Sequence, residues 1–321
     1  MKILITGAAG FIGANLCEYM LKKSYSVVGL DNFATGHEYN LNAFKAESNF
    51  SFIEGDIRDF DCCLRATKGV DYVLHQAALG SVPRSLLDPI TSNEVNVNGF
   101  LNMLEASKQN KVKRFVYAAS SSTYGDSKQL PKVEDKIGKP LSPYAITKYV
   151  NELYGEIYAN TYGLETIGLR YFNVFGRRQD PDGAYAAVIP KFIAQFIKGE
   201  SPQINGDGSF SRDFTYIDNV IQMNYLAMLT TNPKAVNQVY NTAVGERITI
   251  LEMTELIREG LAKFDSSIPN ISIKFGPDRK GDIPHSQASI EKAKRLLNYN
   301  PTHNFQQGLE ESLTWYHDNL K

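Results

Sequence analysis

Short apolar runs alternate with amphipathic stretches along the first half of the chain. Residues 2–6 and 26–30 are apolar runs, and between them the apolar positions of residues 14–23 recur at helical spacing. Continuous apolar runs are typical of strands buried on both faces, and a period of 3.6 residues is typical of a helix that covers them. The pattern predicts a strand, a helix and a second strand, which form one β-α-β unit.

The same alternation continues to about residue 176. We predict further strands at residues 50–57, 71–78, 114–119 and 165–170, and helices at 60–68, 93–108 and 142–162. Parallel strands need crossover connections, which are usually helices, so this order favours a parallel sheet with helices on both faces. The predicted fold class is α/β, a doubly wound parallel sheet of the Rossmann type.

The pattern changes near residue 177. Beyond it the elements are shorter, loops are more frequent and most of the later prolines occur. We therefore predict two regions, a sheet domain at 1–176 and a smaller α/β region at 177–321, from which some segments return to the first. Ligands of open α/β sheets bind at the carboxyl ends of the strands, so the second region should close over that edge.

Composition adds limits on partners and compartment. The 321 residues are 43% hydrophobic, yet no unbroken apolar run is long enough to span a bilayer. The opening apolar run is too short for a signal peptide, so we expect a cytoplasmic globular protein. The 34 basic and 35 acidic residues leave a net charge of −1, which attracts neither nucleic acid nor anionic lipid as a whole. Any recognition of phosphate must therefore be local.

Cysteine and basic residues indicate no site of their own. The three cysteines, Cys17, Cys62 and Cys63, lack ligand spacing with histidine, so we expect ordinary reduced thiols and no metal site. The basic cluster at 111–114 is expected to be a solvated turn before the next strand.

Glycines recur at three-residue intervals after the first predicted strand, at Gly7, Gly10 and Gly13. Glycine permits a tight turn and lets backbone N–H groups approach a pyrophosphate, whose charge the start of a helix also favours. Asp31 follows the second strand, where its carboxylate can accept both hydroxyls of an adenine ribose and repel a 2′-phosphate. The spacing predicts an NAD site rather than a glycine turn of an unrelated α/β protein.

Further residues at the same edge fit a bound dinucleotide. Asp56, near the end of the third predicted strand, can accept an adenine amino group, and the small Ala77 and Ala78 leave room for the cofactor. His75 in the fourth strand is expected to be packed rather than catalytic. Residues 80–85 should form a loop at this edge, which makes them a candidate substrate loop.

Hydroxyl groups follow the fifth predicted strand, at residues 120–124, and a helix start follows them. Ser142 can cap this helix and Pro143 suits its first turn, so Tyr144 and Lys148 should lie one turn apart on one face. A tyrosine with its ordinary pKa near 10 acts as a base only if its phenolate is stabilised, which a neighbouring lysine can do. With Ser120 holding the same substrate oxygen, this set can deprotonate a secondary alcohol while NAD takes the hydride.

A tyrosine and a lysine at this spacing also occur by chance on exposed helices. Their position after a dinucleotide turn and a serine-rich strand end favours the catalytic interpretation. The motifs that support it are Gly7-x-x-Gly10-x-x-Gly13, Asp31-Asn32, Asp56-Ile57, Tyr144-x-x-x-Lys148 and Tyr171-Phe172-Asn173. With these motifs the chain resembles the extended short-chain dehydrogenase/reductases over essentially its whole length.

Within that family the chain is most similar to the UDP-hexose 4-epimerases, and closest to those acting on UDP-N-acetylglucosamine and UDP-N-acetylgalactosamine. The resemblance implies a tightly held NAD that is regenerated in each turnover, and a 4-keto sugar that turns over in the pocket. It also implies a homodimer, in which the helices near 93–108 and 142–162 of two chains form a four-helix bundle.

The resemblance further implies a set of residues around each ligand, with residues 1–176 as the NAD-binding domain and the second region mainly binding the UDP-sugar. For NAD the residues are Gly7, Gly10, Phe11, Ile12, Gly13, Asp31, Asn32, Gly36, Asp56, Ile57, Gln76, Ala77, Ala78, Tyr144, Lys148 and Tyr171. For the UDP-sugar they are Gly80, Ser81, Arg84, Ser120, Ser121, Ser122, Tyr144, Asn173, Ala187, Val188, Lys191, Gln203, Asn205, Arg212, Arg279, Asp282 and Ser286. Arginines suit phosphates because their forked donors match phosphate oxygens.

Three small residues imply that N-acetylated sugars are accepted. Gly80, Ala187 and Ser286 stand where epimerases restricted to plain hexoses have larger residues, and together they should widen the pocket. The alternative is that Ser286 is merely a serine of a surface loop.

Other enzymes of the superfamily are less compatible with this sequence. Sugar-nucleotide 4,6-dehydratases have an Asp-Glu pair where this chain has Ser121-Ser122, and UDP-glucuronate decarboxylases usually have a glutamate at the second of these positions. A UDP-glucuronate 4-epimerase or another NAD-dependent nucleotide-sugar enzyme stays open as an alternative. A non-catalytic NAD-binding protein is disfavoured because both the tyrosine and the lysine are present.

Overall fold

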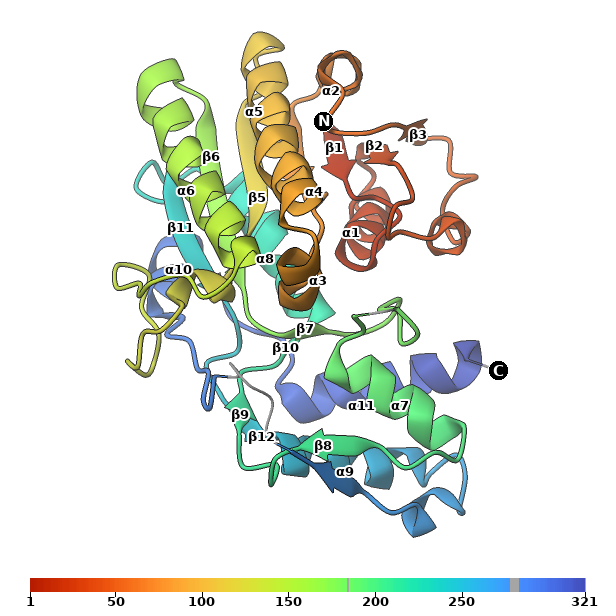
Figure 1. Ribbon diagram of the computed structural model, residues 1–321. Helices are drawn as coiled ribbons and strands as arrows, with labels where there is room; N and C mark the ends of the chain where they lie inside the picture. The colour runs from red at the N-terminus through yellow and green to blue at the C-terminus, as the bar shows by residue number, and fades with distance from the viewer. Residues whose placement is uncertain (184, 278–282, 321) are drawn as a thin grey trace.

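A seven-stranded, wholly parallel sheet is the centre of the computed structural model, which describes residues 1–183, 185–277 and 283–320 (Figure 1). Its strand order is β11-β6-β5-β4-β1-β2-β3. The strands are β1 (Lys2–Thr6), β2 (Ser26–Asp31), β3 (Phe50–Glu54), β4 (Tyr72–His75), β5 (Arg114–Ser120), β6 (Glu165–Tyr171) and β11 (Gln238–Thr242). The chain order reverses at β1, which lies between β2 and β4, so a ligand crevice is expected at their carboxyl ends.

Helices cover both faces of this sheet. One face is covered by α2 (Phe60–Thr67), α5 (Phe100–Gln109) and α6 (Pro143–Tyr162), and the other by α1 (Phe11–Lys22) and α8 (Ile217–Leu229). Successive side chains of a strand point to opposite faces. Accordingly, Leu4 belongs to the core that contains Phe100, whereas Ile3 and Ile5 belong to the core under α1 and α8. The doubly wound α/β fold predicted from the sequence is confirmed.

Two predicted boundaries on the α5 side are wrong. The expected loop at 80–85 contains α3 (Val82–Leu87), because the Ser81 hydroxyl accepts the Arg84 N–H at 3.2 Å and starts a helix. The helix predicted at 93–108 begins earlier: α4 (Pro89–Asn93) continues through the π-helical η2 (Glu94–Gly99) into α5. Its start is set by the Asp88 side chain, which accepts the Thr91 N–H at 3.0 Å.

Other predicted boundaries and surroundings also differ from the structure. Strands β3 and β4 end at Glu54 and His75, earlier than predicted, so the residues that follow them leave the sheet. The basic cluster is not wholly solvated, because Arg114 is only 7% exposed. Its guanidinium pairs with Glu165 at 2.7 Å and donates to the carbonyl oxygens of Ala227 and Met228.

The second half of the chain forms short elements beyond the carboxyl edge of the sheet (Figure 1). The short strands β7 (Val174–Phe175) and β10 (Thr215–Tyr216) pair in parallel, as do β8 (Gln203–Asn205) and β13 (Lys274–Gly276), whereas β9 (Ser211–Arg212) and β12 (Ile248–Thr249) are antiparallel. The helices are α7 (Val188–Ile197), α9 (Ile250–Leu261), α10 (Glu291–Leu297) and α11 (Phe305–Asn319), and 3₁₀ turns occur at Glu38–Leu41, Ser121–Tyr124 and Ile268–Asn270. Helix α8 and strand β11 return to the main sheet.

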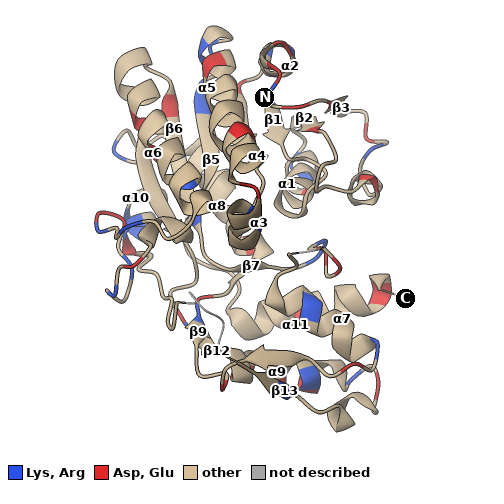
Figure 2. Ribbon diagram, viewed as in Figure 1, with Lys and Arg blue, Asp and Glu red and all other residues tan. Residues whose placement is uncertain are grey.

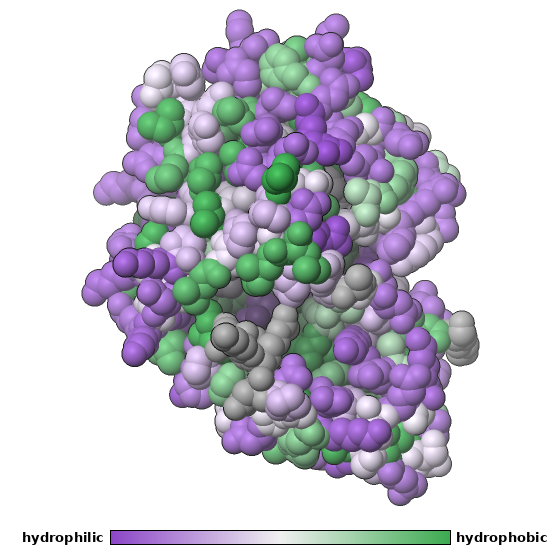
Figure 3. Space-filling view, viewed as in Figure 1, coloured by the Kyte–Doolittle hydropathy of each residue, from purple (hydrophilic) through white to green (hydrophobic). Residues whose placement is uncertain are grey.

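Charged residues of both signs are interspersed over the two regions in the ribbon of Figure 2. Hydrophobic side chains gather instead on the face over α6 and α3 (Figure 3). They include Ile146, Leu153 and Ile157 of α6 and Leu87 of α3, of which Leu87 is 77% exposed. Exposed apolar residues that gather on one face in this way form a stripe that is a candidate contact surface for another protein.

The structure bears on two expectations, one about membrane-spanning segments and one about the cysteines. Within the described ranges, no helix is both long and apolar enough to cross a bilayer. The cysteines Cys17, Cys62 and Cys63 are buried free thiols, as predicted.

Candidate active site

The turn after β1 requires glycine at its first and last motif positions. Gly7 has a φ of +69°, a conformation that favours glycine, and its N–H donates to the Leu30 carbonyl oxygen at 2.8 Å. A Cβ atom on Gly13 would lie 1.9 Å from the Gly7 carbonyl oxygen, so any side chain there would displace the turn from α1. The two residues hold the start of α1 against the tip of β1, which leaves backbone N–H groups available to a pyrophosphate.

Asp31 lies at the end of β2 and is itself held by the backbone. Its Oδ2 atom accepts the Ala9 N–H at 2.9 Å and its Oδ1 atom accepts the Phe33 N–H at 2.8 Å. Each oxygen retains a lone pair, so the carboxylate can still accept a ribose hydroxyl. The Asp31 side chain is thereby fixed in orientation at the cleft.

Asp56 belongs to a small polar cluster beside Asp31. It accepts from the Asn32 amide at 2.9 Å and pairs with Arg58 at 2.7 Å. The hydrogen bond from Arg58 holds the pKa of the Asp56 carboxyl below its usual range. Arg58 also lines the cleft and was not predicted from the sequence, although its position two residues after Asp56 made it a candidate.

A cleft of about 500 Å³ runs over the carboxyl ends of the strands around β1. The predicted cofactor residues that line it are Gly7, Gly10, Phe11, Ile12, Gly13, Asp31, Asn32, Asp56, Ile57, Gln76, Ala77 and Ala78. Gly36 lies just outside and packs on Ala9, which a Cβ atom at Gly36 would meet at 2.8 Å. Tyr171 lies beneath Gln76: its hydroxyl donates to the Gln76 Oε1 atom at 3.0 Å and accepts from Asn224 at 2.8 Å.

His75 is packed, as predicted. It is 3% exposed, its ring contacts those of Phe100 and Phe115, and its Nδ1 atom lies 2.8 Å from the Thr6 hydroxyl. Burial lowers the pKa of His75 to about 3. A neutral, enclosed imidazole is a structural group of the sheet.

The start of α6 places Tyr144 and Lys148. Ser142 caps the helix, its hydroxyl accepting the Ala145 N–H at 3.2 Å, and Pro143 occupies the first turn. The Lys148 Nζ atom lies 6.0 Å from the centre of the Tyr144 ring and donates to the Ala118 carbonyl oxygen at 2.8 Å. The two side chains therefore share one face of the helix, directed at the end of β5.

The titration behaviour of the pair follows from its enclosure. Burial lowers the pKa of Lys148 to about 8. Burial raises the pKa of Tyr144, and a hydrogen bond with Ser120 lowers it. In the protein alone Tyr144 is thus a neutral phenol, and Lys148 is mostly protonated at neutral pH.

The serines at the end of β5 have a local structural task as well. The Ser120 hydroxyl accepts the Ser122 N–H at 3.2 Å and lies 2.9 Å from the Ser122 hydroxyl, which donates to it. Ser120 thereby caps the short 3₁₀ turn that contains Ser121 and Ser122. The turn fixes the Ser120 hydroxyl in reach of Tyr144.

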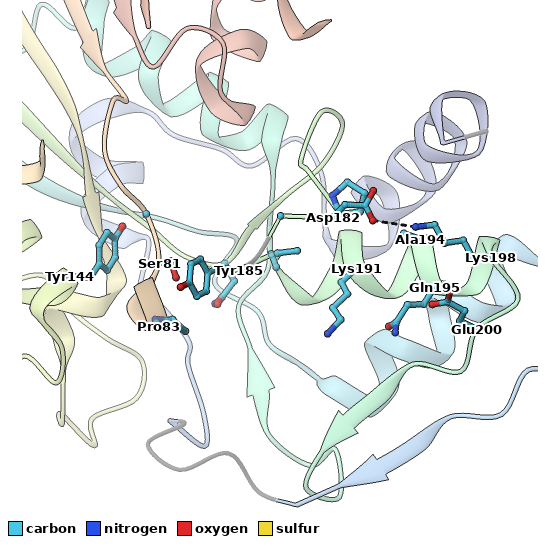
Figure 4. A pocket seen from close by; sticks show the side chains of 16 residues that line it. Ser81, Pro83, Tyr144, Asp182, Tyr185, Lys191, Ala194, Gln195, Lys198 and Glu200 are labelled. Carbon is cyan, nitrogen blue, oxygen red and sulfur yellow. Dashed lines mark hydrogen bonds and ion pairs between the residues drawn. The ribbon is translucent and has the colours of Figure 1, made fainter. Parts of the chain in front are cut away.

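A second cavity of about 920 Å³ adjoins the cleft (Figure 4). Tyr144 borders it on the side of α6, and Lys191 projects from α7 across it. The predicted substrate residues that line it are Gly80, Ser81, Tyr144, Asn173, Ala187 and Lys191. Gly80, Gly183, Tyr185, Ala186 and Ala187 line both spaces, so the cleft and the cavity meet at these residues.

Some predicted substrate residues lie elsewhere in the described structure. Arg84 lines the cleft rather than the second cavity, and its guanidinium lies 5.3 Å from the centre of the Tyr185 ring. Val188 begins α7, whereas Gln203, Asn205 and Arg212 lie on β8 and β9. Ser286 is half-buried, and its N–H donates to the Ser211 carbonyl oxygen at 3.0 Å. Arg279 and Asp282 lie outside the described residues.

Sequence reasoning missed several residues that line the cavity. Gln195 of α7 and Lys198, the residue that follows this helix, line the cavity together with Lys191, and Lys198 pairs with Asp182 at 3.2 Å (Figure 4). The spacing of Lys191, Gln195 and Lys198 is helical and could have indicated them. Nothing in the local sequence indicated Tyr185, because its place is set by the fold of the segment before α7.

Comparisons with known proteins agree with this geometry. Residues 3–243 match the model of the family described as NAD dependent epimerase/dehydratase family. The chain belongs to this family, within the extended short-chain dehydrogenase/reductases. A putative UDP-glucose 4-epimerase of Methanocaldococcus jannaschii is 35% identical over 99% of both chains.

Two solved structures are also similar. A UDP-N-acetylglucosamine 4-epimerase from Methanobrevibacter ruminantium, in complex with UDP-N-acetylmuramic acid, is 37% identical with a TM-score of 0.91, covering 99% of this chain and 98% of the other. A UDP-glucuronic acid 4-epimerase from Bacillus cereus, in complex with UDP-glucuronic acid and NAD, is 33% identical with a TM-score of 0.89, covering 99% of both chains. NAD is the cofactor of this enzyme family, as the sequence predicted.

Proposed function

We propose that the protein is a UDP-sugar 4-epimerase that interconverts UDP-N-acetylglucosamine and UDP-N-acetylgalactosamine through a 4-keto intermediate. The observation that supports it most is the place of Tyr144, which lines the second cavity, next to the dinucleotide cleft. A group in this cavity can act on a substrate atom that faces a cofactor in the adjoining cleft. The similarity to epimerases of UDP-linked hexoses, N-acetylhexosamines and uronic acids supports the reaction type.

The cleft residues fit NAD. Gly7 and Gly13 leave the space that side chains would fill, and Asp31 offers acceptors for ribose hydroxyls. Gly10, Phe11 and the start of α1 would hold the pyrophosphate. Held there, NAD would supply the acceptor and later the donor of the hydride that C4 of the sugar loses and regains.

The side chains near Tyr144 would handle the proton of the 4-hydroxyl. Tyr144 accepts it through its phenolate oxygen, and Ser120 donates a hydrogen bond that holds the same substrate oxygen. Because burial raises the pKa of Tyr144, the phenolate requires positive charge nearby. The Lys148 ammonium, at 6.0 Å from the ring, supplies part of that charge.

The second region would hold the nucleotide. We propose that Asn173, Lys191 and Arg212, together with the backbone of β8 around Gln203 and Asn205, contact uridine and diphosphate. Arginine and lysine suit a diphosphate because their positively charged N–H groups pair with phosphate oxygens. Since the chain as a whole has almost no net charge, the attraction must come from such local cations. Arg279 and Asp282 complete the proposed set.

Small residues at the cavity support the N-acetylated substrate. Gly80 and Ala187 line the space shared by cleft and cavity, and within the described structure only its chain neighbours lie within 4 Å of a Cβ atom placed on Gly80. An acetamido group must pass through this space when the keto sugar turns. We propose Ser286 as the third small residue that permits this motion.

One assay tests the proposal. Purified protein is incubated separately with UDP-N-acetylglucosamine, UDP-glucose and UDP-glucuronate without added NAD, and the products are separated by chromatography. We expect the 4-epimer of UDP-N-acetylglucosamine, and NAD or NADH on denaturation of the protein. Turnover of UDP-glucuronate alone would favour the uronic acid alternative, and activity that requires added NADPH and consumes it stoichiometrically would exclude an epimerase.

A further inference from the structure

Asp213 lies between β9 and β10 and is completely buried, with 0% of its surface exposed. Its Oδ1 atom accepts the Val244 N–H, and its Oδ2 atom accepts the N–H groups of Gly245 and Ala288, each at 3.1 Å. A buried carboxylate is costly unless hydrogen bonds replace its water. Here three backbone donors, from two distant segments, converge on one side chain.

The segments joined by Asp213 also contain proposed substrate residues. Arg212 precedes Asp213, and its Nη1 atom donates to the carbonyl oxygens of Ser211 and Pro284. Ser286 lies two residues before Ala288, and its N–H donates to the Ser211 carbonyl oxygen. A shift of the Asp213 carboxylate would therefore move the supports of Arg212 and Ser286 together.

We propose that Asp213 is a positioning residue for the UDP-sugar, which acts by fixing Arg212 and the Ser286 segment against each other. The inference rests on the proposed function, because that function assigns Arg212 and Ser286 to substrate binding. The chemistry explains the residue type: three N–H donors need acceptors only, and an ionised carboxylate offers them on both oxygens. An asparagine would turn an NH₂ group toward an N–H donor.

Binding of the UDP-sugar should depend on the protonation of Asp213. The pKa of Asp213 is raised to about 7, mainly by burial. The three backbone hydrogen bonds oppose this rise, and the negative charge of Glu246 adds to it. Among the described residues, further ionisable groups near it are Tyr299, whose hydroxyl donates to the Ala243 carbonyl oxygen, the preceding Arg212, and His285, whose Nδ1 atom lies 2.9 Å from the Ser211 hydroxyl. Protonation of Asp213 would place an O–H donor against three N–H donors and disturb the positions of Arg212 and Ser286. Affinity for the UDP-sugar should therefore fall as the pH falls through about 7.

The free energy of unfolding should change with pH in the direction opposite to that of the affinity for the UDP-sugar. Because the folded pKa of about 7 lies above the unfolded value for aspartate, near 3.9, the folded state takes up more protons between these values. The contribution of this group to stability then increases as the pH falls from 7 toward 4. Weaker binding at pH 6 without a lower melting temperature would separate positioning from a purely structural role.

The test compares Asp213→Asn with Asp207→Asn, the same chemical change at an exposed position six residues earlier. For Asp213→Asn at pH 8 we expect KM for UDP-N-acetylglucosamine to rise about tenfold, with kcat within about twofold and NAD content unchanged, since one lost charged hydrogen bond has this magnitude. Asp207→Asn should leave both constants unchanged. An unchanged KM with a lower melting temperature would overturn the proposal.

The wild-type protein provides a second measurement if Asp213→Asn does not fold. KM for UDP-N-acetylglucosamine, whose diphosphate diester does not titrate in this range, should rise between pH 8 and pH 6. The rise should persist in His285→Gln, which removes the nearby imidazole. A flat KM across this range, or a rise that disappears in His285→Gln, would overturn the proposal.

Binding of UDP at pH 8, measured by calorimetry, distinguishes failure of the positioning role from failure of the proposed function. If the wild type binds UDP and Asp213→Asn binds it equally well, the positioning role alone is wrong. If the wild type binds no UDP, the proposed function fails, and the positioning role fails with it.

Discussion

The two regions of the molecule position their ligand groups in different ways. In the first region, Asp31 and Ser120 end long parallel strands whose register is fixed by the whole sheet. In the second, Arg212 lies on a two-residue strand and Ser286 in a loop, and both depend on a few side-chain and backbone hydrogen bonds. The sheet therefore gives a rigid frame for cofactor and proton transfer, whereas the substrate wall rests on local contacts.

The two regions should tolerate larger side chains to different degrees. Gly13 cannot accept even a methyl group, because the Gly7 carbonyl oxygen is 1.9 Å from the position of the added atom. Ser286 is only half-buried, so a larger side chain there can be accommodated by the loop. Changes at the glycine turn or at Tyr144 should abolish the chemistry for every substrate, whereas changes at Ser286 should alter the choice among substrates.

The largest expected effect is that of Tyr144→Phe. Removal of the phenol should lower kcat for every UDP-sugar by roughly 10²–10⁴-fold, the usual contribution of a general base. Lys148→Met should also lose most turnover, because it removes the cation near the ring. The measurement is initial rate at saturating substrate, with Tyr162→Phe, an exposed residue of the same helix, as the control. Near-full activity in Tyr144→Phe would contradict the mechanism.

A substrate-dependent effect is expected from Ser286→Tyr. The phenol should block the path of an acetamido group, so turnover of UDP-N-acetylglucosamine should fall more than about tenfold while that of UDP-glucose is retained or improved. The ratio of kcat/KM for the two sugars is the quantity to measure, and Ser209→Tyr at an exposed position serves as the control. An equal loss for both sugars would show that residue 286 does not select the substrate.

A change of assembly is expected from the paired substitution of Leu153 and Ile157 by glutamate. Both side chains are exposed on α6, within the hydrophobic stripe over α6 and α3 (Figure 3). If the predicted homodimer forms through this stripe, buried glutamates would be too costly and the variant should have the mass of a monomer. Light scattering at micromolar concentration measures it, with Phe264→Glu in the second region as the control. A monomeric wild type would refute the dimer.

The smallest effect is expected from Ser142→Ala at the start of α6. Loss of the hydrogen bond to the Ala145 N–H should lower the free energy of unfolding by about 1 kcal/mol. Because the rest of α6 remains packed on the sheet, NAD content should not change. Chemical denaturation measures the change, and Ser272→Ala at an exposed position is the control. An effect as large as that of Tyr144→Phe on turnover would mean that the cap positions the base directly.

Local rules were sufficient for much of the first region. The glycine turn, the acidic end of β2 and the one-turn spacing of Tyr144 and Lys148 depend on residues close together in the sequence. Helical and strand periods determine which of these side chains share a face. The sequence likewise predicted His75 to be a packed histidine near a strand end rather than a catalytic one, and it is buried.

Other features were decided only by contacts between distant segments. Arg114 belongs to a basic run in the sequence, and its burial results from Glu165 and two carbonyl groups more than a hundred residues away. Similarly, Asp213 became a buried acceptor because Val244, Gly245 and Ala288 bring their N–H groups to it. A local pattern sets the type of an element, but only the folded chain determines which donors meet a charged group, because burial and hydrogen bonding depend on every segment packed around it.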